Sequence, residues 1–152
     1  MLFLFDLDHT TICAKHRGAF DSHGRGCLDT WRKLSTPENI AKDKALPLAD
    51  EWRKILRKGA TVGIVTSRVI SDADVSMLRG HGLGWHYMLS RPDGCNDGAA
   101  LLKFRLISKA FGWDWACKNA ALYDDDRTVI EGLTALGLTV YDSISINERL
   151  SA

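Results

Sequence analysis

The stretch Leu2-Phe3-Leu4-Phe5-Asp6-Leu7-Asp8-His9-Thr10-Thr11 decides the fold. Its apolar run, residues 2–5, is typical of a strand that is buried on both faces of a parallel sheet. The run stops at two acids, Asp6 and Asp8, which are separated by one residue. Because parallel sheets carry their functional sites at the carboxyl ends of the strands, these carboxylates are predicted to face a crevice there.

The rest of the chain alternates between strand and helix patterns. Short apolar runs predict further strands at 61–65, 85–89, 120–123 and 138–141. Apolar spacing, caps and glycine stops predict helices that begin at Thr36 and that cover 48–58, 71–79, 98–111 and 128–136. The predicted fold class is α/β, a Rossmann-like three-layer sandwich around a mostly parallel five-stranded sheet.

The chain is predicted to form one domain over residues 1–152, with a small flap insert at 12–45 and no large cap. Within the insert, residues 12–35 are polar and rich in glycine, so they are expected to form a loop or a small hairpin. Trp113 and Trp115 lie just past a predicted helix end, and we expect them to pack in the core.

Composition narrows the class of protein further. The chain is 45% hydrophobic and 26% charged, as in ordinary globular proteins. Its net charge of +1 gives no overall field that would attract nucleic acid or an anionic membrane. The apolar opening at 1–5 is too short for a signal peptide or a membrane span, so we expect a cytoplasmic protein. The four cysteines contain no Cys-x-x-Cys pair and are predicted to be free thiols.

Polar residues follow three of the predicted strands. They are Asp6 to Thr11, then Thr66-Ser67-Arg68, then Asp124-Asp125-Asp126-Arg127. Neighbouring strand ends would bring these groups into one site. The predicted metal ligands are Asp6, Asp8, Asp125 and Asp126, because carboxylate oxygens are the ligands that Mg²⁺ prefers. Three successive acids leave it open whether Asp124 or Asp125 is the ligand.

This set of residues fits phosphoryl transfer. A carboxylate held in line can attack phosphorus and form an aspartyl-phosphate, and Asp6 is the predicted nucleophile. A second acid must protonate the leaving oxygen and later activate water, which is the role predicted for Asp8. Thr66 and Lys103 are predicted to donate hydrogen bonds to the phosphate during catalysis.

These motifs resemble those of the haloacid dehalogenase superfamily. Leu4 to Thr10 matches its first motif, and Thr66, Lys103 and the Asp125-Asp126 pair follow in the family's order. The resemblance spans residues 3–127. It implies an Asp6 nucleophile, an Asp8 acid/base, and Mg²⁺ held by Asp6, the Asp8 carbonyl and an acid of the last motif. Asp8 also argues against dehalogenase chemistry, since the dehalogenases lack that second acid.

A closer resemblance is to the 3′-phosphatase domain of phage polynucleotide kinase-phosphatases, on Thr66-Ser67-Arg68 and Asp125 to Thr128. It implies that Arg68, Arg91 and Lys103 contact the phosphate, and it suggests a role in nucleic-acid repair. The chain departs from this family where His9 replaces a glycine, and where Ala99 and Ala100 replace acids. No P-loop is present, so no kinase half is expected.

The insert carries basic residues that could form a rim beside the nucleophile. They are Lys15, His16, Arg17, His23, Arg25, Arg32 and Lys33. Together with Thr10, His16 and Arg17 are predicted to bind the substrate, and Trp31 among them could stack on a base. Cys13, His16, His23 and Cys27 are also ligand types that fit a structural zinc, although two loop thiols and two substrate-side histidines are the simpler interpretation.

Structural roles compete with several of these assignments. Thr66 to Arg68 also fits a helix cap, and Asp124 to Asp126 fits a capping cluster for the helix that follows. Lys103 fits an exposed helix lysine, and Arg91 fits an ordinary loop charge.

Three functions are consistent with the sequence. The leading hypothesis is a Mg²⁺-dependent phosphatase of nucleic-acid 3′ ends, since an uncapped site suits a chain end. The alternatives are a phosphatase of mononucleotides or other small phosphoesters, and a non-catalytic phosphate-binding module. The insert separates the first two, because a flap closed over Asp6 favours small substrates and an open basic groove favours strands.

Overall fold

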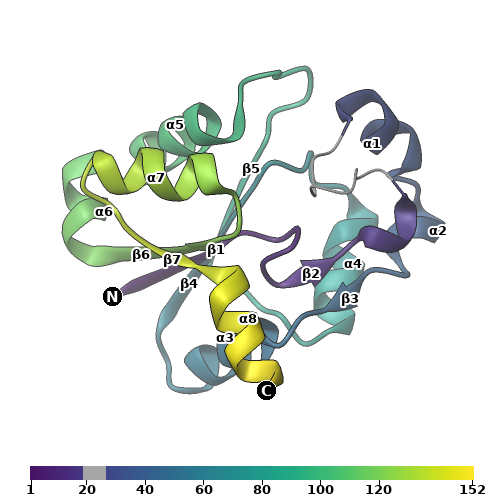
Figure 1. Cartoon of the computed structure of the whole chain (residues 1–152), viewed down its shortest axis with the longest axis horizontal. Helices are drawn as coiled ribbons and strands as arrows, with labels where there is room; N and C mark the ends of the chain where they lie inside the picture. Colours follow the sequence, from purple (N-terminus) through teal and green to yellow (C-terminus); the bar gives the residue numbers. More distant parts are fainter. Residues whose placement is uncertain (19–26) are drawn as a thin grey trace.

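The computed structural model describes residues 1–18 and 27–152 and is built around a five-stranded sheet in the order β5-β4-β1-β6-β7 (Figure 1). The strands are β1 (Leu2–Phe5), β4 (Thr61–Thr66), β5 (Tyr87–Ser90), β6 (Ala120–Asp124) and β7 (Thr139–Asp142). Every neighbouring pair is parallel, which confirms the predicted α/β class. The chain builds outward from β1 in one direction and then in the other, so the strand order reverses at β1.

Helices cover both faces of this sheet. The first face packs against α5 (Ala99–Phe111), α6 (Trp113–Asn119) and α7 (Arg127–Ala135). The second packs against α3 (Leu48–Arg57), α4 (Asp72–Gly80) and α8 (Ser143–Ser151). Figure 1 shows α5, α6 and α7 on one side of the strands, with α3 and α8 on the other. The result is the predicted three-layer sandwich.

Strand β1 explains why its sequence is apolar at every position. Leu4 belongs to the core cluster under α5 to α7, and Phe5 belongs to the cluster on the opposite face. The Phe5 ring stacks between Trp52 and Tyr123, with ring centroids 4.9 and 4.8 Å away. Burial on both faces fixes the register of this strand, and therefore the point at which Asp6 leaves it.

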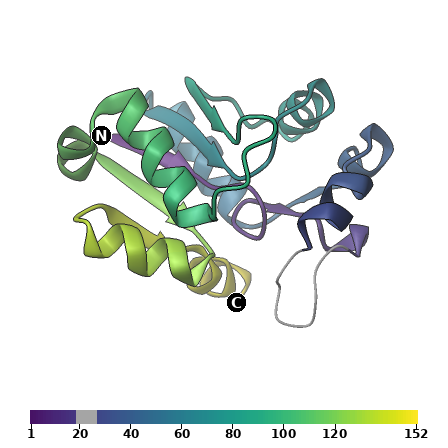
Figure 2. The ribbon, with the colours of Figure 1, turned by 90° about the horizontal axis from the view of Figure 1, so that it is seen from above.

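The insert is more regular than predicted. Strands β2 (Ile12–Cys13) and β3 (Lys44–Ala45) form an antiparallel pair at its base. Between them lie a 3₁₀ turn η1 (Lys15–Arg17), α1 (Leu28–Leu34) and α2 (Pro37–Ile40), with residues 19–26 outside the described part. Figure 2 shows these elements beyond the end of the sheet that lies opposite the N-terminus. Thr36 caps α2 as expected, because its side chain accepts from the Asn39 amide.

Three helices were missed by the sequence prediction. Helix α1 has no side-chain cap at its start and no glycine at its end, so the expected loop over 12–35 was wrong there. Helices α6 and α8 were not predicted at all. Helix α8 begins at the Asp142 cap and carries serine, asparagine and isoleucine, which are weak helix formers. Its contacts with α3 and β6 hold it in place.

Two further expectations can be compared with the structure. All four cysteines are free, as predicted. Among residues 1–18 and 27–152, no helix is long and apolar enough to cross a bilayer.

Candidate functional site

The loop after β1 carries Asp6 and Asp8 at the carboxyl end of the sheet. The carbonyl of Leu7 accepts hydrogen bonds from the amides of Thr10, Thr11 and Ile12, at 3.1, 3.0 and 2.9 Å. His9 adopts the left-handed conformation, with φ of 62°, to close this turn. A glycine takes up that conformation without steric cost, which explains the glycine of the related motif. Histidine is among the residues that tolerate it better than most.

Three carboxylates meet at the carboxyl ends of β1 and β6. Asp6, Asp124 and Asp125 each offer an oxygen, and these oxygens lie within 4.8 Å of one another. The ammonium of Lys103 donates to Asp6 Oδ1 at 2.8 Å and to Asp124 Oδ2 at 2.6 Å. Lys103 comes from α5 and is buried, so it is not the exposed helix lysine that the sequence also allowed.

Burial dominates the electrostatics of this cluster. Desolvation raises the pKa of Asp6 to about 7, despite the opposing effect of Lys103. Burial and neighbouring carboxylates raise the pKa of Asp124 and of Asp125 to about 6 each. Burial alone would lower the pKa of Lys103, but Asp124 and Asp6 outweigh it and leave that pKa raised. The cluster therefore resists full ionisation until another cation joins it.

The residues present fit a divalent cation. Three carboxylates opposite one ammonium leave two formal negative charges when all are ionised, which is the charge that one Mg²⁺ compensates. All the nearby donors are hard oxygens, as Mg²⁺ prefers. Among the described residues this is the one group of three or more acid, histidine or cysteine side chains placed for a metal.

The side chain of Thr10 contacts the carboxylate cluster through Asp6. Its hydroxyl is fully buried and lies 2.9 Å from Asp6 Oδ2 and 3.0 Å from Ser143 Oγ. The side chain of Asn147 in α8 donates to the Thr10 carbonyl at 2.9 Å. Thr10 was predicted to bind substrate, but its burial and contacts make it a positioning partner of Asp6. Ser143 and Asn147 carried no sequence signal, because they lie in a helix that was not predicted.

The last acidic motif is shifted by one residue relative to the prediction. Asp124 ends β6 and Asp125 faces Asp6, whereas Asp126 caps α7. The Asp126 carboxylate accepts from the Thr128 amide and hydroxyl at 2.8 and 2.7 Å. The carboxylates that meet Asp6 are therefore those of Asp124 and Asp125 rather than the predicted pair of Asp125 and Asp126. Strand β6 extends to Asp124, one residue beyond the predicted end at residue 123, and Asp126 is taken up as the cap of α7.

Asp8 lies beside the cluster and is held by Arg68. The guanidinium donates from Nε and Nη2 to the two Asp8 oxygens at 2.9 and 2.6 Å. Its Nη1 donates to Asp74 at 2.8 Å, and Nη2 also reaches Asp43 at 2.9 Å. Arg68 is only 3% exposed, so this side chain binds protein carboxylates rather than presenting itself to a phosphate. Both oxygens of the Asp8 carboxylate accept hydrogen bonds from Arg68. This carboxylate is not part of the cluster of Asp6, Asp124 and Asp125.

Thr66 and Arg91 organise neighbouring loops. The Thr66 hydroxyl is buried and accepts from the Arg68 amide at 3.0 Å, so it closes the turn after β4, whereas the cap of the helix that follows, α4, is Ser71. Arg91 donates to the carbonyls of Ser67, Cys95 and Asp97 at 2.8 to 3.0 Å. Its predicted phosphate contact is replaced by these bonds, which tie the loop after β5 to the loop after β4.

Two basic residues of the insert, His16 and Arg17, are paired with the same acid. Arg17 is buried and forms a close ion pair with Asp43, and His16 Nε2 lies 2.7 Å from the same carboxylate. Both were predicted to bind substrate and are instead engaged within the fold. Asp43 was missed because a single acid in a loop carries no motif. Asp74 was also missed, although it stands three residues after the Ser71 cap, where a capping box places its acid. Of the suggested zinc ligands, Cys13, His16 and Cys27 form no metal-type cluster among the described residues, and His23 lies outside them.

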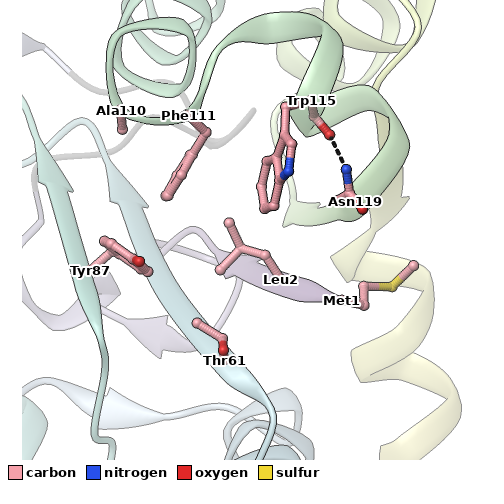
Figure 3. A pocket seen from close by; sticks show the side chains of 8 residues that line it. All are labelled: Met1, Leu2, Thr61, Tyr87, Ala110, Phe111, Trp115 and Asn119. Atoms are coloured by element: carbon pink, nitrogen blue, oxygen red, sulfur yellow. Dashed lines mark hydrogen bonds between the residues drawn. The ribbon is translucent and has the colours of Figure 1, made fainter.

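The opposite end of the sheet carries a cavity of about 480 Å³ that is lined by both apolar and polar side chains (Figure 3). Its eight lining residues are Met1, Leu2, Thr61, Tyr87, Ala110, Phe111, Trp115 and Asn119. Trp115 is 47% exposed and lines this cavity, so its predicted core position was wrong. Trp113 instead packs against Phe104, with ring centroids 4.8 Å apart. None of the lining side chains is charged, so the acid chemistry is confined to the other end.

Comparison with known families follows this geometry. Residues 1–92 match the family model described as bacteriophage T5 5′-deoxynucleotidase. The chain belongs to this T5 5′-deoxynucleotidase family. The match includes the loop that carries Asp6 and Asp8, the insert and the loop after β4, and it ends just after β5. A search of curated proteins gave no match.

Solved structures with the same fold extend over nearly the whole chain. A chain of the Pnkp1/Rnl/Hen1 complex is 16% identical over 93% of this protein, with a TM-score of 0.69. This protein covers only 45% of that chain, so it spans less than half of its length. A haloacid dehalogenase-like hydrolase from Streptococcus pneumoniae is 13% identical, with coverage of 93% and 83% and a TM-score of 0.68. The β-phosphoglucomutase of Clostridium difficile is 12% identical, with coverage of 98% and 96% and a TM-score of 0.59.

These findings confirm the predicted haloacid dehalogenase-like fold. Membership of the T5 5′-deoxynucleotidase family and the phosphatase-type fold together support phosphoester hydrolysis. The acids that the T5 family model does not cover, Asp124 and Asp125, meet Asp6 only because β6 pairs with β1.

Proposed function

We propose that this protein is a Mg²⁺-dependent phosphomonoester hydrolase that acts on deoxynucleoside 5′-monophosphates through a phosphorylated Asp6. The observation that carries the chemistry is the group of Asp6, Asp124 and Asp125 around Lys103, in which Asp125 alone is partly exposed, with Asp8 alongside. Membership of the T5 5′-deoxynucleotidase family supports the substrate class.

The chain's own residues account for both halves of the reaction. In the first, an Asp6 oxygen attacks phosphorus while the bond from phosphorus to the ester oxygen breaks, and Asp8 gives that oxygen its proton. In the second, water attacks phosphorus and the bond from phosphorus to the Asp6 oxygen breaks, while Asp8 accepts a proton from the water. Inorganic phosphate leaves and the Asp6 carboxylate is restored. Thr10 and Lys103 hold the Asp6 carboxylate in a fixed orientation.

Mg²⁺ held by Asp6, Asp125 and Asp124 would neutralise charge between the carboxylates and the incoming phosphate. This matters because Asp6 attacks as a carboxylate, and its raised pKa of about 7 leaves it partly protonated at neutral pH without a further cation. Lys103 supplies one positive charge to the same carboxylates but is shared between Asp6 and Asp124.

The position of the insert favours a small substrate. Trp31 of α1 lies over the guanidinium of Arg68, 5.4 Å from its ring centroid, and Arg68 in turn holds Asp8. From the next residue along α1, Arg32 donates to Asn96 of the loop after β5 at 2.8 Å. Helix α1 is therefore tied both to the general acid and to a loop across the crevice, as expected of a flap that closes over a mononucleotide.

A 3′-phosphorylated strand is the second candidate, on the likeness to the Pnkp1 chain and on the motif resemblance. The geometry favours it less. Arg68 and Arg91, which that resemblance assigns to the phosphate, are buried and hydrogen-bonded within the protein. The basic rim is also reduced, because Arg17 is paired with Asp43.

A phosphate-release panel tests the proposal directly. The substrates are a deoxynucleoside 5′-monophosphate, the matching 3′-monophosphate, and oligonucleotides phosphorylated at either end, each with Mg²⁺ and with EDTA. We expect Mg²⁺-dependent release from the free 5′-monophosphate, with at least about tenfold higher kcat/KM than from either oligonucleotide. Preference for the 3′-phosphorylated oligonucleotide would establish the second candidate instead.

The same panel separates catalysis from mere phosphate binding. An Asp6→Asn variant keeps the shape of the side chain but loses the nucleophile, and trapping with labelled substrate should give a phosphorylated parent protein and no label in the variant. Equal turnover by variant and parent would reject the mechanism. No release from any substrate by the parent protein would favour the non-catalytic module.

A further inference from the structure

Asp43 is a buried acid that the proposed reaction does not use. It lies between α2 and β3, is 2% exposed, and engages three basic side chains. Its Oδ1 accepts from Arg17 Nε at 3.1 Å and lies 2.7 Å from His16 Nε2. Its Oδ2 accepts from Arg68 Nη2 at 2.9 Å and from Arg17 Nη2. A carboxylate buried to this degree persists only because it is paired on every side.

Arg68 connects this acid to the general acid. Its Nη2 is shared between Asp43 and Asp8, and its Nε makes the second bond to Asp8. Two parallel bonds from one planar guanidinium fix both the position and the plane of the Asp8 carboxylate. The Asp43 carboxylate accepts a hydrogen bond from the same Nη2 atom. It therefore helps to fix the position of the guanidinium that binds Asp8.

Arg17 connects the same acid to the insert. Its guanidinium stacks over Trp31 of α1, 4.5 Å from the ring centroid, and its Nη1 donates to Ser35 at 3.2 Å. A continuous chain of charged contacts thus runs from α1 through Arg17, Asp43 and Arg68 to Asp8. Every carboxylate and guanidinium in it except Asp8 is nearly or fully buried.

We propose that Asp43 is a positioning residue that orients Asp8 through Arg68, and that it couples the seating of the helical insert to proton delivery to the leaving group. This inference rests on the proposed function, in which Asp8 protonates the ester oxygen. It predicts a dependence on the leaving group. A nucleoside alkoxide needs that proton as the bond to phosphorus breaks, whereas p-nitrophenolate leaves readily without it.

The test compares kcat/KM of Asp43→Asn for a deoxynucleoside 5′-monophosphate and for p-nitrophenyl phosphate. Because kcat/KM reports the steps up to cleavage of the ester, it isolates proton delivery to the leaving oxygen. We expect a loss of about 10- to 100-fold for the nucleotide and less than about threefold for the aryl ester, as for a misplaced catalytic group. Equal losses on both substrates, or no loss on either, would overturn the proposal.

Asp74→Asn is the matched control. Asp74 is also buried and also bonded to Arg68, but through Nη1, which does not contact Asp8. We expect this variant to lose thermal stability, since Asp74 completes the cap of α4, with a smaller change in leaving-group dependence than Asp43→Asn. The same selectivity change in both variants would mean that any lost charge near Arg68 suffices, and would overturn a specific role for Asp43.

A second readout does not require activity. In ¹⁵N-labelled protein the Arg68 Nε–H should be protected from exchange by its bond to Asp8, and Asp43→Asn should lower that protection at least about tenfold. Unchanged protection would overturn the proposal even if the parent protein cleaves no nucleotide, an outcome that would reject only the proposed substrate. If Asp43→Asn does not fold, Asp43→Glu keeps the charge but displaces it, and the same two measurements apply with smaller expected effects.

Discussion

The two ends of the central sheet differ in chemistry. At the carboxyl end, acids and bases pack against one another, with Asp6, Arg68 and Lys103 buried and Asp8 partly exposed. At the amino end, an aromatic cavity has no charged side chain in its lining. In a parallel α/β sheet the helices begin at the carboxyl end, so their amides and positive dipole ends point to the side where a phosphate would lie. The direction of the strands, rather than the presence of a cavity, therefore indicates which end of the sheet carries the functional site.

The largest expected effect comes from removing the nucleophile at the carboxyl end. Asp6→Asn should lower kcat for any phosphomonoester by at least about 1000-fold, because no other group can form the covalent intermediate. The fold should be retained, as checked by circular dichroism and gel filtration. Activity within tenfold of the parent would mean that the crevice at this end works by another mechanism.

A second pair of variants tests the corrected register of the acidic motif. Asp125→Ala should lower Mg²⁺-dependent kcat by about 100-fold, since it removes a charged oxygen from the metal-type cluster. It should not lower thermal stability in EDTA, because the raised pKa of Asp125 shows that its charge is unfavourable there. Asp126→Ala should do the opposite and cost about 1 kcal/mol of stability through the lost cap, with activity within about threefold. Interchanged results would restore the Asp125-Asp126 assignment.

Acidity and metal should act together on the stability of this end. The pKa values of Asp6, Asp124 and Asp125 lie near 7, 6 and 6 when folded, against 3.8 for an aspartate in an unperturbed setting. The folded state therefore binds more protons than the unfolded chain between about pH 4 and 7, so stability contributed by these groups falls as pH rises through that window. Lys103 titrates above it and does not reverse the sign.

Thermal melts in EDTA at pH 5 and pH 7.5 measure this effect. From these three groups we expect the higher Tm at pH 5, and we expect added Mg²⁺ to raise Tm at pH 7.5 by a few degrees, roughly, and by less at pH 5. Asp125→Ala serves as the control, because it should weaken both the pH dependence and the Mg²⁺ response. An equal rise in Tm on adding Mg²⁺ at both pH values would mean that the metal does not bind to these carboxylates.

The smallest effect is expected at the amino end. Trp115→Ala removes a half-exposed ring that stacks near Phe111, with ring centroids 5.8 Å apart. We expect a loss of about 1 kcal/mol in unfolding free energy and a kcat/KM within twofold of the parent. Loss of activity with an unchanged Tm would show that the aromatic cavity takes part in function, and that activity does not depend on the carboxyl end of the sheet alone.

Much of the fold followed from local patterns. The wholly apolar run at 2–5 predicted a doubly buried central strand, and Phe5 and Leu4 do face opposite cores. Apolar spacing and a glycine stop predicted α3, and the Ser71 cap predicted α4. Helix α8 gave no such signal, since its intrinsic propensity is weak and Asn147 joins it to Leu48 and Thr10 across the fold.

Part of the site was also predicted from local sequence patterns. Asp6, Asp8 and Lys103 stand in ordered motifs, and the structure brings Lys103 to Asp6 and Asp8 to the same loop. The substrate contacts of Arg17, Arg68 and Arg91 stay predictions, since a basic side chain looks the same in sequence whether it binds substrate or protein. In the structure Asp43 pairs with Arg17 and Arg68, Asp74 also pairs with Arg68, and backbone carbonyls bind Arg91. Asp43 stands in no motif, and Asp74 belongs to the capping box of α4.

The sequence by itself determined the α/β class, the order of the elements and the identity of the acids that leave β1, because apolar periodicity and strand-end polarity are local properties. Three features follow from the tertiary structure alone. They are the choice of Asp124 and Asp125 as the acids that meet Asp6, the hydrogen bond from Thr10 to Asp6, and the link that Asp43 makes between the insert and Arg68, which binds Asp8. These outcomes depend on where strands end relative to one another and on which charges must be paired once water is excluded. Neither quantity is set by neighbouring residues along the chain.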